Sequence, residues 1–283
     1  MADAKRRKLG RWALGFAAIA LAWLVGVWPP PLWWRDHWPC ETAMMREVER
    51  STPPTFHPTA LKDISPVLQR MVIIGEDSRF RTHRGIDPAE IADALGVNGH
   101  SGWRTTLGDL WRHRDRLRGA STITQQLAKN LYLSASRNPL RKLKEAVTAV
   151  SLELALPKDR ILELYLNVAE WGPGIWGADA ASRAYFGVAA AGLDERQAAA
   201  LAATLPHPRT SNPTFRTDRM LERRNLILAR YHGVDVYIPP AAEEIDSLVV
   251  PEVLVPAPES LKVEVPASRD TILDTAKARS DST

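Results

Sequence analysis

The sequence predicts a mainly α-helical domain behind a single N-terminal transmembrane helix. A charge-free apolar stretch near the N-terminus has the length of a membrane span, and beyond it apolar residues recur at helical spacing. No stretch shows the sustained apolar–polar alternation that is typical of half-buried strands. The 283 residues include a single cysteine, Cys40. An internal disulfide, and any zinc or iron–sulfur site that needs several thiolates, is therefore excluded.

Residues 12–34 are the predicted anchor because they contain no charged side chain. As a helix, Trp12–Trp28 would rise about 25 Å, which is close to the thickness of a bilayer core. Five Lys and Arg residues precede this stretch, and Asp3 alone opposes them. The positive-inside rule therefore places residues 1–11 in the cytoplasm and everything after Trp34 outside.

Two further expectations concern this span. Its last tryptophans, Trp28, Trp33 and Trp34, should form an aromatic belt at the outer interface. A cleaved signal peptide is the alternative, because Ala18–Ala22 contains small-x-small patterns. Those patterns lie inside the apolar run, with Trp23–Trp28 still to come, so we favour an uncleaved anchor.

The rest of the chain divides into three parts. Residues 35–60 contain several prolines and are the expected juxtamembrane connector, and residues 61–232 are expected to form one helical domain. Residues 240–283 hold nine acidic and four basic residues and are the expected mobile, acidic, proline-containing tail. Their net charge of −5 leaves +9 on the first 239 residues. Such a basic body indicates an anionic partner: a phosphorylated substrate, phospholipid headgroups or nucleic acid.

The helices of the domain follow from caps, spacing and stop signals. Ser65 is expected to cap a helix that has Pro66 at its first position. Ser121 is expected to cap another helix, which continues through Leu131. Prolines and glycines mark the ends of later helices. The remaining expected helices begin at Pro88 or cover residues 141–156, 158–169, 178–185, 194–205 and 216–231.

The first candidate for chemistry is the acidic pair Glu76-Asp77, at the end of the strongly apolar helix that contains Met71–Ile74. A carboxyl held against an apolar helix end is partly desolvated, which raises its pKa and suits proton transfer near neutral pH. Taken alone, a solvated acidic pair at a helix end is the more common arrangement.

The second candidate is the motif GASTITQQLAKN, residues 119–130. The first turn of its helix offers free N–H groups, which are a ready site for an anion. Polar side chains three and four residues apart share one helix face, and amides with an ammonium suit sugar hydroxyls and phosphate. Those side chains are Thr122, Gln125, Gln126 and Lys129. Taken alone, an ordinary polar face with a capping serine explains the pattern.

The third candidate is a basic cluster that precedes a mostly apolar helix and contains Arg137 and RKLKE, Arg141–Glu145. Arg141 and Glu145 are four residues apart, so an ion pair along the helix is the simplest interpretation. The alternative is that Glu145 is a second carboxylate opposite Glu76 in a cationic groove.

Together these motifs resemble the glycosyltransferase family 51 domain of the peptidoglycan glycosyltransferases. The family pattern reads E-D-x-x-F-x-x-H-x-G, G-x-S-T-I-T-Q-Q-x-x-K-N, R-K-x-x-E, I-L-E-x-Y-L-N and A-A-x-x-Y-F-G. Five blocks in this order are highly specific, and the resemblance covers roughly residues 61–231. The matching blocks are Glu76–Gly85, Gly119–Asn130, Arg141–Glu145, Ile161–Asn167 and Ala180–Gly187.

The resemblance implies a fold similar to lysozyme, with two helical lobes around an extended cleft. Members of the family polymerise lipid II into β-1,4-linked glycan strands and release undecaprenyl pyrophosphate. The chain has neither the S-x-x-K nor the K-T-G motif of the transpeptidase domain that larger members add. We therefore expect a monofunctional enzyme of a Gram-negative inner membrane, with its catalytic domain in the periplasm.

The resemblance also implies roles for single residues. Glu76 matches the general base, which takes the proton of the attacking C4 hydroxyl of the acceptor. Lys129 and Arg137 match positions that hold the pyrophosphate of the donor, and Glu145 matches the second essential carboxylate. The other residues expected to bind substrate or to shape its site are Ser121, Thr122, Gln125, Gln126, Asn130, Arg141, Asp77, Phe80 and His83.

The implied ligands and partners are those of cell-wall synthesis. No covalent cofactor is implied, whereas a divalent metal, Mg or Mn, could lie near the pyrophosphate with Glu145 as its ligand. The expected partners are lipid II, the nascent glycan strand, the membrane and other cell-wall synthesis proteins, and nucleic acid is not expected. The chain departs from the family in a longer segment, Gly96–Arg118, which could touch lipid.

Two alternatives remain open. A hydrolase or lytic transglycosylase of the lysozyme superfamily would share the fold and a catalytic glutamate. It would not need the cations Lys129 and Arg137, because cutting glycan releases no pyrophosphate. A catalytically inactive scaffold for cell-wall assembly would be expected to lack Glu76 or Lys129, and the chain has both.

Overall fold

Helices make up most of the regular structure in the computed structural model, which describes residues 2–47, 57–89, 121–133, 136 and 138–239. This confirms the prediction of a mainly α-helical protein. Short 3₁₀ helices occur at η1 (Pro31–Arg35), η2 (Leu61–Asp63) and η4 (Ala190–Gly192). The α-helices are α1 (Ala2–Val25), α2 (Ala43–Glu47), α3 (Pro66–Glu76), α6 (Ile123–Tyr132), α7 (Pro139–Ala155), α8 (Lys158–Val168), α9 (Ala178–Phe186), α10 (Glu195–Thr204) and α11 (Thr217–Tyr231).

A small hairpin interrupts the helices after α8. Strand β1 (Glu170–Gly172) pairs in antiparallel fashion with β2 (Ile175–Trp176). Each strand is too short to show an alternating pattern, so the sequence predicted no strands here. Gly174 lies at the tip with a φ of 71°, a left-handed conformation that glycine adopts without steric cost.

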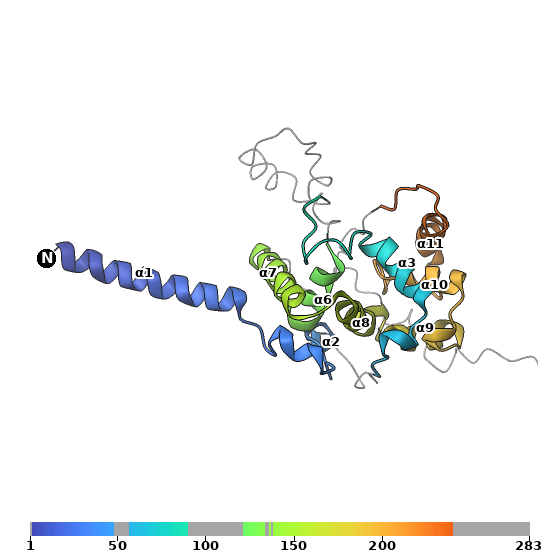
Figure 1. Cartoon of the computed structure of the whole chain (residues 1–283), viewed down its shortest axis with the longest axis horizontal. Coiled ribbons are helices and arrows are strands. Elements are labelled where there is room, and N and C mark those ends of the chain that lie inside the picture. The colour runs from blue at the N-terminus through green and yellow to red at the C-terminus, as the bar shows by residue number, and fades with distance from the viewer. Residues whose placement is uncertain (1, 48–56, 90–120, 134–135, 137, 240–283) are drawn as a thin grey trace, which may run out of the picture. The chain divides into compact units, whose positions relative to one another are not determined.

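The helices pack in two groups around one apolar core. In the first group α3, α10 and α11 lie against one another, and in the second α6 packs against α2, α7 and α8 (Figure 1). The core runs through both groups without a break and includes Phe80, Leu127, Tyr165 and Leu201, all fully or almost fully buried. The two groups therefore share one folding unit, and a polar group buried between them is costly unless it finds a hydrogen-bond partner there.

The cap of α6 differs from the prediction. Thr122, and not Ser121, is the N-cap residue: its hydroxyl accepts a hydrogen bond from the Gln125 backbone N–H, and Gln125 Oε1 accepts one from the Thr122 N–H, both at 3.1 Å. This capping box requires Glu or Gln three residues after the cap. Thr122 meets that requirement with Gln125, whereas Ser121 is followed at that spacing by Thr124.

The N-terminal segment also differs from the prediction. Helix α1 ends at Val25, and Trp34, expected in an aromatic belt, is buried in the domain core at 5% exposure. Its indole Nε1 donates a hydrogen bond to the hydroxyl of Tyr132 at 2.5 Å. The expectation for Trp34 is therefore wrong, while Trp28 and Trp33 are exposed. Among the helices in the described part of the chain, we find none with both the length and the apolar character needed to cross a membrane.

Where the structure describes it, the predicted connector packs on the domain. Met45 of α2 is fully buried, and α2 lies against α6. The side-chain amide of Asn167 bonds to both the N–H and the carbonyl of Thr59, at 2.7 and 2.9 Å. Arg160 donates from Nε to the carbonyl of Trp34 and from Nη2 to that of His37. These contacts are formed by residues far apart in sequence, so local composition does not reveal them.

Several predictions lie outside the described residues. The helix expected to begin at Pro88 is described only as far as Ala89. The segment Gly96–Arg118, the side chain of Arg137 and the acidic tail of residues 240–283 are likewise outside the described part of the chain.

Candidate functional site

Glu76 lies at the last position of α3, with a side chain that is only 4% exposed. Its Oε2 accepts a hydrogen bond from the side-chain amide of Gln126 at 2.9 Å. Its Oε1 lies 3.3 Å from Nη2 of Arg223, which forms an ion pair with it. The carboxylate therefore has one donor on each oxygen, from two different helices, α6 and α11.

Arg223 is the charged partner that the sequence analysis missed. Its guanidinium, on a side chain 12% exposed, also donates to the carbonyl of Gly75 at 2.5 Å and to that of Pro239 at 2.6 Å. The arginine is thus fixed between the last turn of α3 and the segment that follows α11. Only tertiary packing brings it to Glu76, because the two residues are 147 positions apart and an arginine on a helix is a common surface residue.

A second buried group supports Gln126 from the other side. The hydroxyl of Tyr165, on α8, donates a hydrogen bond to Gln126 Oε1 at 2.8 Å. Burial raises the pKa of Tyr165 well above its usual value, and the negative charges of Glu76 and Asp77 raise it further, against the opposing effect of Arg223. The tyrosine therefore stays protonated and remains a donor at all physiological pH values.

Asp77, next to Glu76, is a buried structural link. Each of its carboxylate oxygens lies 2.9 Å from Nε2 of His83, and Oδ2 accepts the backbone N–H of Ile123 at 2.9 Å. His83 Nδ1 in turn accepts the N–H of Gly85 at 3.2 Å. A neutral imidazole with its proton on Nε2 satisfies both contacts, a tautomer assigned from this network. The end of α3 is thus tied to the first turn of α6.

The loop after α3 completes this link. Thr122 donates from its hydroxyl to the carbonyl of Gly85 at 2.7 Å. Gly85 has a φ of 87°, and a Cβ there would lie 3.0 Å from the backbone of Ala149, so only glycine fits. Phe80 is fully buried, with the ammonium of Lys158 at 4.4 Å from its ring centroid. Phe80 and His83 are therefore structural supports of this region.

Glu145 is the second buried carboxylate, with a side chain 3% exposed. Its Oε2 accepts from Nη1 of Arg141 at 2.7 Å, the ion pair that the helical spacing predicted. Its Oε1 accepts from Nζ of Lys142 at 2.6 Å, and that ammonium also donates to Oγ of Ser121 at 2.7 Å. The role of Lys142 was missed, although a lysine three residues before Glu145 is a recognisable helical pair.

The two carboxylates are connected to the same helix. Glu76 is linked to α6 through Gln126. Glu145 is linked through Lys142 to Ser121, the residue before the N-cap of α6. Lys129 follows Gln126 by three residues on α6, so both side chains leave the same side of that helix. It is half-buried, and in the described part of the chain it forms no side-chain hydrogen bond or ion pair. Arg137, expected beside it, lies outside the described residues.

The other residues expected at the site occupy different places. Thr122 and Gln125 are buried and use their side chains in the cap of α6. Asn130, 9% exposed, lies one residue after Lys129. Ser121 is half-buried beside Lys142. Their contact with a substrate stays a prediction.

Glu145 does not fit a divalent metal. Each of its oxygens already accepts a hydrogen bond from a cationic nitrogen, at 2.7 and 2.6 Å, so a divalent ion bound there would lie close to two positive charges. The described residues contain one cluster with metal-ligand spacing, formed by Asp77, His83 and Asp87. Asp77 already accepts hydrogen bonds from His83 and Ile123, and Asp87 accepts one from Arg79 Nε at 2.6 Å. These ligand atoms are therefore engaged in contacts within the protein. We therefore derive no chemical step through a metal.

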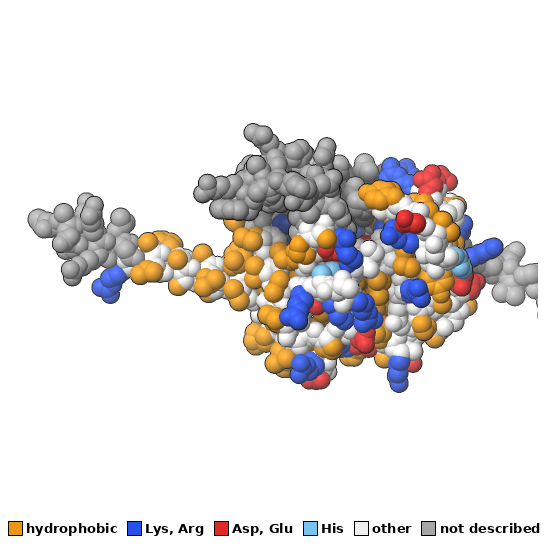
Figure 2. Space-filling model, turned by 45° about the horizontal axis from the view of Figure 1, so that its top comes forward, with side chains coloured by type: hydrophobic (Ala, Val, Ile, Leu, Met, Phe, Trp, Pro, Cys, Tyr) orange, Lys and Arg blue, Asp and Glu red, His pale blue; other side chains and the backbone are white. Residues whose placement is uncertain are grey.

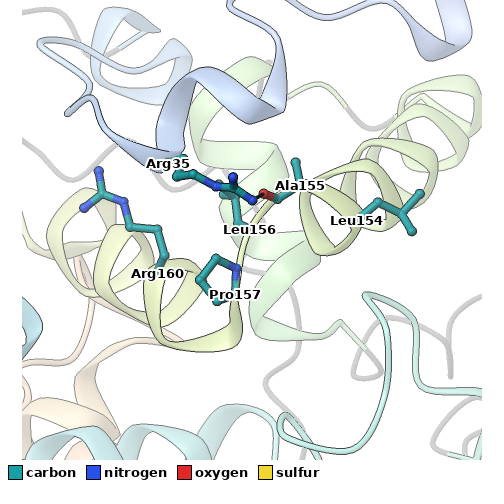
Figure 3. Close-up of a pocket in the computed structure, with 6 residues that line it drawn as sticks. All are labelled: Arg35, Leu154, Ala155, Leu156, Pro157 and Arg160. Atoms are coloured by element: carbon teal, nitrogen blue, oxygen red, sulfur yellow. Dashed lines mark hydrogen bonds between the residues drawn. The ribbon is translucent and has the colours of Figure 1, made fainter.

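A pocket of about 580 Å³ lies elsewhere, where α7 ends and α8 begins (Figure 3). It holds none of the candidate chemical groups. Arg35 donates across it to the carbonyl of Ala155 at 3.3 Å. Its lining residues are Arg35, Leu154, Ala155, Leu156, Pro157 and Arg160. The pocket marks a junction between the segment after α1 and the domain, and we assign it no ligand.

Comparison with known proteins supports one family. Residues 43–232 match the family described as Transglycosylase. The biosynthetic peptidoglycan transglycosylase of Thiobacillus denitrificans is 42% identical over 80% of this chain and 97% of its own length. The proteins of the same name from Bordetella avium and Azoarcus sp. are 37% and 41% identical over 81% and 74% of this chain, and over 95% and 88% of their own lengths.

The contacts of Asp77 predict a specific loss of stability. In Asp77→Asn one side-chain oxygen becomes an NH₂ group, which must face the donor of His83 or of Ile123. We expect a loss of about 1–3 kcal/mol in the free energy of unfolding, measured by urea denaturation of the full chain in detergent. The matched change Asp218→Asn is at an exposed position in the first turn of α11. It should lower the free energy of unfolding by only about a few tenths of a kcal/mol. Equal stability of the two variants would contradict the linking role of Asp77.

Proposed function

Because the chain belongs to the transglycosylase family, and is therefore a peptidoglycan glycosyltransferase of cell-wall synthesis, we propose that it polymerises lipid II with Glu76 as the general base. The observation that carries this assignment is the geometry of Glu76: a nearly buried carboxylate at a helix end, with one donor on each oxygen. A base held in this way needs little reorganisation when the reaction begins.

In the proposed reaction the C4 hydroxyl of the acceptor's GlcNAc attacks C1 of the donor's MurNAc. Glu76 takes the hydroxyl proton as the new C–O bond forms. The bond from C1 to the pyrophosphate breaks, and its electron pair leaves with undecaprenyl pyrophosphate. Attack from the opposite side inverts the configuration and produces a β-1,4 bond.

The leaving group needs positive charge, and we propose that Lys129 and Arg137 supply it. Lys129 supports this role because it is a half-buried cation on the same side of α6 as Gln126. Charge-assisted contacts to phosphate are among the stronger hydrogen bonds. Glu145 would orient the donor by holding Arg141 and Lys142 in place, without a metal.

For the fold, we propose the two-lobed arrangement of lysozyme. Two groups of helices on one shared core, α3 with α10 and α11, and α6 with α2, α7 and α8, support two lobes. The residues proposed to act on substrate come from both groups: Glu76 from the first and Lys129 from the second.

We also propose that the N-terminal segment anchors the enzyme in the inner membrane, with residues 1–11 in the cytoplasm and the domain in the periplasm. The charge-free stretch of residues 12–34 after five cations supports this. Apolar side chains are exposed along α1, among them Trp12, Phe16 and Ile19 (Figure 2). An enzyme confined to the membrane plane would meet a substrate confined to the same plane.

A hydrolase or lytic enzyme is the alternative that the same fold and glutamate would serve. Incubation of the full chain with labelled lipid II in detergent separates the two activities. A polymer ladder supports the proposal, whereas cleavage of preformed glycan without polymer formation contradicts it.

Glu76→Gln should abolish polymerisation while the protein stays folded, because the amide cannot accept the proton. Removal of a general base costs about 10²–10⁴ in rate. The rate of lipid II consumption measures this, and thermal unfolding confirms the fold. Glu222→Gln makes the same chemical change at an exposed position of α11 and should retain the wild-type rate. Near-normal turnover by folded Glu76→Gln would refute the assignment.

Lys129→Ala should weaken binding of a donor analogue that contains pyrophosphate and should also lower the rate. The reason is the loss of a charge-assisted contact, which is worth about 1.5–3 kcal/mol. Lys129→Arg should restore only part of the binding, because a planar guanidinium does not replace a compact ammonium. Lys62→Ala removes an equal charge from an exposed position and serves as the control. Wild-type affinity in Lys129→Ala would remove this residue from the donor site.

The purified protein from cell membranes should retain its complete N-terminus. Intact-mass spectrometry measures this directly, and carbonate extraction should leave the protein in the membrane pellet. The physical reason is that the small-residue patterns lie within the apolar run and not after it. A mature N-terminus near Trp23 would show that the segment is a cleaved signal peptide.

A further inference from the structure

Two hydrogen bonds in series join a buried tyrosine to the proposed base. The hydroxyl of Tyr165 donates to Oε1 of Gln126 at 2.8 Å, and Nε2 of Gln126 donates to Oε2 of Glu76 at 2.9 Å. Tyr165 lies on α8 and is 1% exposed, so it cannot touch a substrate. The hydrogen-bonded route from Tyr165 to the proposed base therefore runs through Gln126.

The direction of these bonds is fixed by the chemistry of the two ends. An ionised carboxylate can only accept, so Gln126 must turn its NH₂ group towards Glu76. The amide oxygen then points the opposite way and needs a donor, which the tyrosine hydroxyl supplies. With the amide rotated by half a turn, its oxygen would face the carboxylate oxygen and two acceptors would lie in contact. The carboxylate thus sets the orientation of the amide, and the hydroxyl of Tyr165 holds the amide there by donating to its oxygen.

The donor at the far end is constant. Burial and the charges of Glu76 and Asp77 raise the pKa of Tyr165 well above its usual value, so the hydroxyl keeps its proton near neutral pH. The other contact of Glu76, to Arg223 at 3.3 Å, is longer than the contact to Gln126. The amide is therefore the closer of the two groups that position the carboxylate.

We propose that Tyr165 is a positioning residue for the glycosyl transfer: its hydroxyl holds the Gln126 amide in place, and the amide holds Glu76 in place to accept the proton. This inference rests on the proposed function, in which Glu76 is the general base. It gives a role to Tyr165, which lies within the family-like block Ile161–Asn167 and had none in the sequence analysis. It also gives Gln126 a defined partner on each side.

The direct test is Tyr165→Phe in the full chain, assayed with lipid II in detergent. The ring is retained, and only the hydroxyl is lost. We expect kcat to fall about 3- to 10-fold, the effect of one neutral hydrogen bond, while KM for the donor stays within about twofold. Tyr185→Phe is the matched control, because its hydroxyl also donates internally, to the carbonyl of Trp171 at 2.9 Å, on another part of the domain. The control should lose a similar amount of thermal stability and keep its kcat.

A double-mutant cycle separates positioning from a general structural effect. In Gln126→Met the amide is absent, so the loss of the tyrosine hydroxyl has nothing left to act through. Adding Tyr165→Phe to Gln126→Met should therefore lower kcat by less than twofold. Full additivity of the two changes would refute the proposal, as would an unchanged kcat in Tyr165→Phe alone.

The failure of this inference can be told apart from failure of the proposed function. If Glu76→Gln remains active, Glu76 is not the general base, and Tyr165 has no base to position. If Glu76→Gln is inactive while Tyr165→Phe matches Tyr185→Phe in kcat, the base is right and only the role of Tyr165 is refuted. A fall in kcat confined to Tyr165→Phe and absent from the Gln126→Met background supports both.

Discussion

The first turns of α6 impose the main constraint on this structure, because many buried polar groups must find partners there. Asp77 takes the backbone N–H of Ile123, Thr122 bonds to Gly85, and Gln126 lies between Glu76 and Tyr165. A polar group of this kind costs free energy if it is left unpaired in a low-dielectric interior. Each bond therefore limits the orientations open to the neighbouring groups. The end of α3, the start of α6 and the middle of α8 are therefore held in one arrangement.

The two buried carboxylates illustrate the same constraint with full charges. Burying an ion is expensive unless it is paired and hydrogen-bonded. Glu145 has Arg141 and Lys142 on its two oxygens, both from its own helix. The ion-pair partner of Glu76, Arg223, comes instead from a different helix, α11. Glu145 is thus supported by its own helix, whereas the contacts of Glu76 depend on the packing of both helix groups.

Helix α6 also connects the site to the N-terminal segment. Tyr132, its last residue, receives a hydrogen bond from Trp34, and α2 packs along it. Arg160 holds the backbone of Trp34 and His37 from α8. The residues that follow α1 are therefore part of the same packed unit as the groups proposed for catalysis. Through these contacts the proposed membrane anchor is connected to α6, the helix that carries Lys129.

The sequence alone determined the mainly helical class, most helix bounds, the ion pair of Arg141 with Glu145 and the motifs that indicate the family. These depend on spacing along one chain segment, where a side chain meets its neighbours three or four residues away. The T-x-x-Q pattern of Thr122 and Gln125 also indicates the cap of α6, one residue after the predicted Ser121. Tertiary structure decided what Glu76 contacts, since Arg223, Gln126 and Tyr165 come from three helices. It likewise placed Trp34 in the core, because burial depends on which surfaces meet and not on local composition.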